Sequence, residues 1–70
     1  MPNAARKLGL NIRRIRLENA MTQGDLCKKL KMEIPYLSNV ENGKKNPTIG
    51  TIERVAKALG VKIEDLIRGI

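Results

Sequence analysis

The chain contains almost no aromatic residues: its 70 residues include one tyrosine, Tyr36, and neither phenylalanine nor tryptophan. The core must therefore consist of aliphatic side chains and methionine. Histidine is absent and Cys27 is the single cysteine, which excludes an internal disulfide and a zinc site of the usual imidazole and thiolate ligands. No apolar run approaches the ~20 residues of a membrane span, and the opening segment lacks the apolar core of a signal peptide. A lone thiol suits a reducing compartment, so we expect a cytoplasmic protein. Because the usual metal ligands are missing, we also expect no metal, and we expect no other cofactor.

Positive charge dominates what the chain does contain. It has 14 lysines and arginines against 7 aspartates and glutamates, a formal net charge of +7. This balance favours a polyanionic partner such as nucleic acid, and the alternative is a merely solvated basic surface. At this length we expect residues 1–70 to form one domain, whose small core depends on close helix packing or on a partner subunit.

Hydrophobic periodicity predicts five helices and no strand, over residues 4–19, 23–30, 34–41, 49–59 and 63–68, the third starting at residue 34 or 35. Inward-facing residues are expected at helical spacing: Leu8, Ile12 and Ile15 in the first helix, and Ile49, Ile52, Val55, Ala56 and Leu59 in the fourth. Thr22 and Thr48 are expected N-caps, while Gly43 and Gly60 suit helix ends. Gly9 suits close approach by another helix. The predicted fold class is all-α.

Residues 22–42 read TQGDLCKKLKMEIPYLSNVEN, two short amphipathic segments joined by a tight connection. Leu26 and Leu30 recur in the first segment, and Leu37 and Val40 in the second. Pro35 stands in the first turn of the second segment, where a missing N–H costs nothing. Two such helices make a helix-turn-helix whose second helix can lie in the major groove of DNA.

Several short motifs occur in order along the chain: Arg16, Thr22-Gln23, Val40-Glu41-Asn42-Gly43, Asn46-Pro47 and the run AKALG over residues 56–60. With them, the chain from about residue 8 to residue 67 resembles the phage Cro/repressor-type helix-turn-helix domain of the XRE-like regulators. The resemblance implies a compact five-helix, lambda-repressor-like domain that binds double-stranded DNA, usually as a two-fold dimer, and regulates transcription.

The sequence departs from the family pattern at four places. Lys31 stands where the family usually has glycine, so a residue with a Cβ is expected at positive φ, at a cost of about 1 kcal/mol. Glu33 replaces the usual Ser or Thr at the start of the third helix, and Lys62 replaces the small capping residue of the fifth. Ile34 and Pro35 occupy positions where relatives often carry polar base-reading side chains.

Helical spacing places five residues on the outer face of the third helix, opposite its buried leucine and valine: Ile34, Pro35, Ser38, Asn39 and Asn42. We predict base reading by Glu33, Ile34, Pro35, Ser38 and Asn39. Asn39 can bind adenine bidentately, Ser38 can bond to several bases, Glu33 can accept from a cytosine amine, and the two apolar residues can pack on a thymine methyl. The alternatives are an inward-turned Ile34 and a merely solvated Asn39.

Phosphate contacts are predicted for Gln23, Gly24, Tyr36, Asn42, Lys44 and Lys45. The start of the second helix offers free N–H groups and a positive dipole end to an anion, and in the family the glutamine there commonly binds the DNA backbone. Such contacts position a protein without reading sequence. Lys28, Lys29, Arg54 and Lys57 are interpreted as ordinary solvated charges.

The resemblance also implies that Arg16 and Glu41 pair across the first and third helices; the alternative is two independent exposed charges. Cys27 stands where relatives usually have alanine, so we expect a small buried residue there, and a redox role is disfavoured because only Lys28 and Lys29 would lower the pKa of its thiol.

The leading function is a sequence-specific DNA-binding transcriptional regulator that acts as a dimer on an inverted repeat, possible contexts being a restriction–modification controller or an autoregulating antitoxin. The alternative is a protein-interaction module that keeps the fold without reading an operator. An enzyme is disfavoured, because the sequence shows no histidine, paired carboxylates or Gly-rich phosphate loop. Ile63, Leu66, Ile67 and Ile70 are more aliphatic surface than one short helix buries. We therefore expect Ile63, Ile67 and Ile70 at a homodimer interface, the alternative being a monomer in which all four side chains pack internally.

Overall fold

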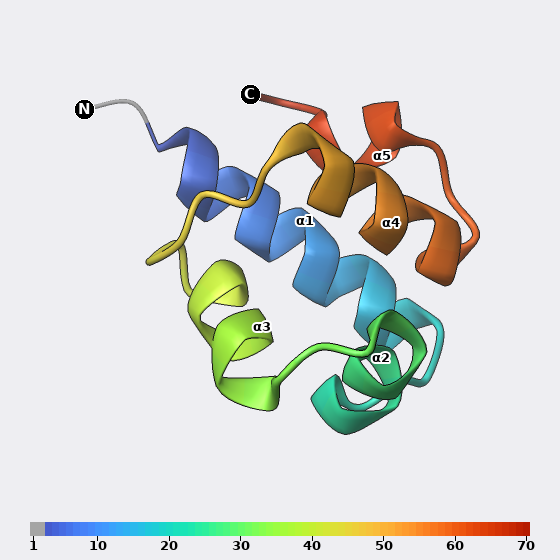
Figure 1. Cartoon of the computed structure of the whole chain (residues 1–70). Helices are drawn as coiled ribbons and strands as arrows, with labels where there is room; N and C mark the ends of the chain where they lie inside the picture. Colours follow the sequence, from blue (N-terminus) through green and yellow to red (C-terminus); the bar gives the residue numbers. More distant parts are fainter. Residues whose placement is uncertain (1–2) are drawn as a thin grey trace.

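The computed structural model describes residues 3–70, which form five α-helices (Figure 1). Their bounds are α1 Ala4–Glu18, α2 Gln23–Leu30, α3 Ile34–Glu41, α4 Ile49–Leu59 and α5 Ile63–Ile67. The predicted all-α class and the order of helices are confirmed. The expected ends differ only for α1 and α5, where Asn19 and Arg68 are C-caps rather than helical residues. Within residues 3–70 no helix combines the length and apolar character needed to cross a bilayer.

α1 crosses the centre of the molecule, and α3, α4 and α5 all contact it (Figure 1). α2 packs between α3 and α4. One aliphatic cluster fills the space between the helices, with contributions from all five: Leu8, Ile12, Ile15, Leu26, Cys27, Leu30, Leu37, Val40, Ile52, Val55, Ala56, Leu59 and Leu66. The core is therefore built without a buried aromatic ring, as the composition predicts.

The prediction that Ile49 faces inward was wrong. Its side chain is 64% exposed, whereas the other four residues of the predicted stripe are buried. Ile49 is the first residue of α4, directly after the N-cap Thr48. Helical periodicity gives the direction of a side chain, but it does not say how far along the helix the neighbouring elements extend.

The helix ends follow the capping residues in the sequence. The Thr22 hydroxyl accepts a hydrogen bond from the Asp25 N–H, and the Asp25 carboxylate accepts one from the Thr22 N–H, each at 2.9 Å. This reciprocal pair satisfies two N–H groups at the start of α2. Gly60 ends α4 at φ 71°, and Lys31 ends α2 at φ 53°. The expected left-handed lysine is therefore present.

A glycine fixes the distance between α1 and α3. Gly9 is buried, and a Cβ built on it would lie 2.3 Å from the carbonyl oxygen of Val40 and 2.6 Å from that of Glu41. Only a residue without a side chain permits this approach. The close contact brings the end of α3 onto α1 and orients the helix-turn-helix on the rest of the fold.

Candidate nucleic-acid interface

The second helix of the helix-turn-helix is held by its inner face and exposed on its outer face. Leu37 and Val40 of α3 join the core with Leu26, Cys27 and Leu30 of α2. The outer face carries the residues expected there. Ile34, Pro35 and Asn42 are exposed, while Ser38 and Asn39 are partly exposed.

Ile34 lies beside the start of α2 and outside the core. Its side chain is 49% exposed, and a Cβ built on Gly24 would lie 3.8 Å from its Cδ1 atom. The inward-turned alternative therefore does not describe the structure. Glu33, the N-cap of α3, is exposed and makes no side-chain capping hydrogen bond. The starts of α2 and α3 thus lie next to each other on the surface.

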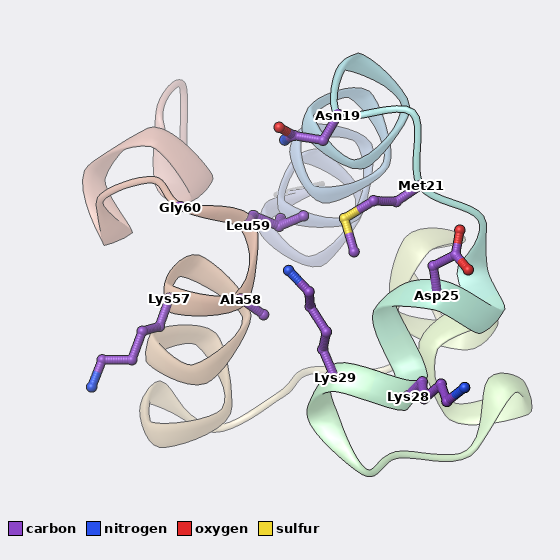
Figure 2. A pocket seen from close by; sticks show the side chains of 9 residues that line it. All are labelled: Asn19, Met21, Asp25, Lys28, Lys29, Lys57, Ala58, Leu59 and Gly60. Atoms are coloured by element: carbon purple, nitrogen blue, oxygen red, sulfur yellow. The ribbon is translucent and has the colours of Figure 1, made fainter.

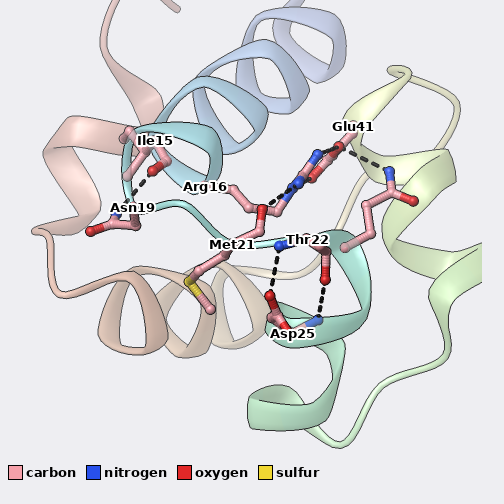
Figure 3. A network of polar contacts seen from close by, with 8 residues as sticks. Ile15, Arg16, Asn19, Met21, Thr22, Asp25 and Glu41 are labelled. Carbon is pink, nitrogen blue, oxygen red and sulfur yellow. Dashed lines mark hydrogen bonds and ion pairs between the residues drawn. The ribbon is translucent and has the colours of Figure 1, made fainter.

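Arg16 and Glu41 form a buried ion pair between α1 and α3 (Figure 3). The guanidinium donates from Nε to Oε2 at 2.7 Å and from Nη2 to Oε1 at 3.0 Å. A third guanidinium donor, Nη1, reaches the carbonyl oxygen of Met21 at 2.7 Å. The two residues are only 6% and 4% exposed. Buried charges need such complete pairing, because an unpaired charge in this place would be strongly destabilising.

Gln23 joins the same network. Its amide Nε2 donates to Oε1 of Glu41 at 3.0 Å, which links the first residue of α2 to the last residue of α3. Sequence reasoning assigned Gln23 to phosphate and missed this bond, for which no local pattern gives a signal. An amide NH₂ carries two donors, so one N–H of Gln23 is not used by Glu41.

Gly24, also predicted to bind phosphate, follows Gln23 in α2, and the other four such residues lie in or after α3. Tyr36 is partly buried, and the Lys45 ammonium lies 5.9 Å from the centre of its ring. Asn42, Lys44 and Lys45 are exposed, and the Lys44 backbone N–H donates to the Asn39 carbonyl oxygen at 2.8 Å. The loop after α3 is therefore tied to the outer face of that helix by a backbone hydrogen bond.

Other cations occupy a second surface. A groove between α2 and α4 is lined by Lys28, Lys29 and Lys57, by other residues of these helices, and by Asn19, Met21 and Gly60 outside them (Figure 2). No residue of α3 lines it. Arg54 is not simply solvated, as the sequence suggested, because its guanidinium donates to the carbonyl oxygen of Leu30 at the end of α2.

Within residues 3–70 no three His, Cys, Asp or Glu side chains gather as a metal site would require. Cys27 is buried, and this burial, with a smaller effect of the Glu41 carboxylate, raises the pKa of its thiol. A raised pKa lowers the thiolate fraction and hence the reactivity.

Residues 12–66 match the family model described as HTH_3, helix-turn-helix. The chain belongs to this family. The resemblance drawn from the motifs is thereby confirmed, and the matched region includes the whole of α2 and α3.

The chain is similar to one relative that is about twice as long and to another of about its own length. It is 31% identical over 64 residues to the HTH-type transcriptional regulator DdrOP3 of Deinococcus deserti, covering 91% of this chain but only 50% of that relative. It is 38% identical over 69 residues to the control protein C.BamHI of Bacillus amyloliquefaciens, covering 96% of this chain and 85% of the relative.

A solved structure has the same fold. The restriction-modification controller protein C.Esp1396I, crystallised as a tetramer in complex with its natural operator, superimposes with a TM-score of 0.81 at 30% identity. The match covers 97% of this chain and all of the controller chain, 100%.

Proposed function

We propose that this protein is a sequence-specific, double-stranded DNA-binding regulator of transcription. The observation that carries the proposal is the outer face of α3, whose residues are exposed or partly exposed while the inner face packs on α2. The end of α3 is held on α1 by the Arg16–Glu41 pair. A rigidly mounted, outward-facing helix in a chain of net charge +7 suits insertion into a major groove.

Roles within the interface follow from position and chemistry. Ser38 and Asn39 would hydrogen-bond base edges, with Glu33, Ile34 and Pro35 at the neighbouring bases. Phosphates would be bound by the groups around α3: Gln23, Gly24, Tyr36, Asn42, Lys44 and Lys45. The backbone N–H groups of Gln23 and Gly24 lie at the start of α2, where a phosphate is favoured electrostatically.

The proposed active form is a two-fold dimer. In α5, Leu66 is buried and Ile63 packs partly on the core, whereas Ile67 and, after the helix, Ile70 are exposed. Those two apolar side chains would be covered by a second subunit, which would also present two α3 helices to an inverted repeat. The interface is small, so full assembly is expected only on DNA.

The proposed biological role is control of a restriction–modification system. It is supported by the likeness to the restriction-modification controller protein C.Esp1396I, whose chain is matched over its whole length. An autoregulating antitoxin is the second candidate. We propose a cytoplasmic location and no catalytic activity.

A protein-interaction module is the alternative function, and one observation favours it. Ile34 and Pro35, exposed at the start of α3, have no side-chain group that can hydrogen-bond to a base. The retained Gln23, Lys44 and Lys45 favour DNA instead.

Selection of bound sequences from random duplex DNA tests the proposal. We expect an inverted repeat whose half-sites are about one helical turn apart, with an affinity that falls steeply as salt rises. Sedimentation of the complex should then give two subunits for each repeat. Equal binding to all sequences at physiological salt would refute operator reading, and one subunit for each repeat would refute the dimer.

A further inference from the structure

The outer face of α3 carries one isolated apolar spot at its start. Ile34 and Pro35 are the first two residues of the helix and both are exposed, while Glu33 before them is charged and Ser38 one turn later is polar. Within residues 3–70 the other exposed large apolar side chains are all outside α2 and α3: Leu10, Leu17, Ile49, Ile67 and Ile70. A patch of one isoleucine and one proline is small, which favours a ligand group of similar size over the protein partner of the alternative function.

One side of the isoleucine lies close to the start of α2. Its Cδ1 atom lies over Gly24, at the distance of ordinary van der Waals contact from where a Cβ would be. The remaining 49% of its surface faces outward. A glycine at this position of α2 leaves room for both the isoleucine and an approaching ligand.

The chemistry of this spot restricts what it can recognise in a major groove. The side chains of Ile34 and Pro35 neither donate nor accept hydrogen bonds, and proline has no N–H. At the base edges of the major groove the apolar group is the methyl on C5 of thymine. Cytosine methylated at C5 presents the same group at the same place.

We propose that Ile34, supported by Gly24 and Pro35, reads the C5 methyl group of a pyrimidine. This inference rests on the proposed DNA-binding function and names the ligand of one part of the interface. The two sources of the methyl differ at C4, where thymine has a carbonyl oxygen and cytosine an amine. The exposed Glu33 carboxylate can accept from the amine, so both sources belong in the test.

The test uses the preferred operator found by selection and the intact protein. Each thymine of one half-site is replaced in turn by uracil, which removes only the methyl, and each cytosine by 5-methylcytosine, which adds it. We expect one position at which the methyl strengthens binding about fourfold, the equivalent of one buried CH₂ group. An effect of uracil assigns thymine as the source, and an effect of 5-methylcytosine assigns the methylated base.

Variants then assign the effect to the residue. Ile34→Ala should abolish the difference between the methylated and unmethylated base at that position. Leu17→Ala, which alters a side chain of similar exposure at 56% on α1, should leave the difference unchanged. Thermal melting of both variants shows that they are folded.

The outcomes separate this inference from the function on which it rests. A protein that prefers one operator but binds all uracil and 5-methylcytosine versions equally would refute methyl reading and leave DNA recognition standing. Selection that yields no preferred sequence would refute both. A methyl effect that persists in Ile34→Ala would also overturn the assignment to Ile34.

Discussion

Arg16 and Glu41 are 25 positions apart in sequence, and their side chains meet in two hydrogen bonds, at 2.7 and 3.0 Å, inside the protein. The pair connects α1 to the last residue of α3, where Gly9 also brings the two helices into contact. Gln23 adds a bond from α2 to the same carboxylate. The buried Glu41 carboxylate therefore connects α1, α2 and α3 next to the proposed DNA-binding face.

Glu41→Ala should lower the free energy of unfolding by about 3 kcal/mol or more, because the buried Arg16 guanidinium would lose its partner. Glu18→Ala removes an exposed carboxylate that pairs with Arg14 on the surface, and it should change stability by no more than ~0.5 kcal/mol. Urea unfolding of both variants measures the difference. Equal small losses would show that the buried pair contributes nothing to stability.

Gly9→Ala should destabilise the protein by about 1–3 kcal/mol, since the added methyl would overlap the Val40 carbonyl oxygen and push α3 from α1. Gly50→Ala is the matched control. A Cβ there would meet only the Thr48 hydroxyl, at 3.9 Å, and alanine in a helix is favoured over glycine by up to ~1 kcal/mol. Thermal melting should therefore move in opposite directions for the two variants, and a neutral Gly9→Ala would contradict the close contact.

Lys31→Gly should stabilise the protein by up to about 1 kcal/mol, because glycine adopts the left-handed conformation of this residue without the Cβ clash. Lys29→Gly makes the same change of side chain within α2 and should instead cost about 1 kcal/mol. Both lysines are exposed, so the loss of charge is matched. A destabilised Lys31→Gly would mean that the lysine side chain contributes more than its backbone conformation costs.

Asn39→Ala should relax the preference at one base pair and cost roughly 1–3 kcal/mol of binding at the preferred operator. Lys44→Ala should weaken binding to every sequence and reduce the salt dependence, as expected for a phosphate contact. Titration of operator and unrelated DNA at several salt concentrations separates the two behaviours. An unchanged operator preference in Asn39→Ala would show that this part of α3 does not face the bases.

Asp25 should make stability depend on pH at the acid end. The hydrogen bond from the Thr22 backbone N–H, with a further contribution from the Thr22 side chain, lowers the pKa of its carboxyl below the ordinary value of 3.8. Because the folded pKa is below the unfolded one, the stabilisation is present above about pH 4 and is lost as the pH falls through the lower, folded value. Asp25→Ala should therefore melt below the wild type at pH 7, and the difference should shrink steadily as the pH is lowered from about 4. A difference in melting temperature that stays constant over this pH range would show that ionisation of the Asp25 carboxyl does not affect stability.

Local chemistry was enough to predict the helices and most of their ends. The exception is Lys31, whose left-handed conformation was implied by the family resemblance, in which glycine usually stands at this position. Thr22 and Thr48 mark two helix starts, and Gly60 marks a helix end. These features could be read from the sequence because each depends on contacts within a few residues of the chain.

Other features were decided only when the helices packed. Ile49 was predicted to be buried and is exposed, because its exposure depends on where neighbouring helices end. The Gln23–Glu41 bond joins residues 18 positions apart, and no spacing rule relates them. The sequence likewise left open whether Ile34 turns inward, and in the structure its side chain lies outside the core, beside Gly24. The sequence by itself determined where the helices form and where most of them begin and end, through periodicity and local hydrogen bonds. The tertiary structure decided which side chains remain outside, because burial is a property of distant segments brought together.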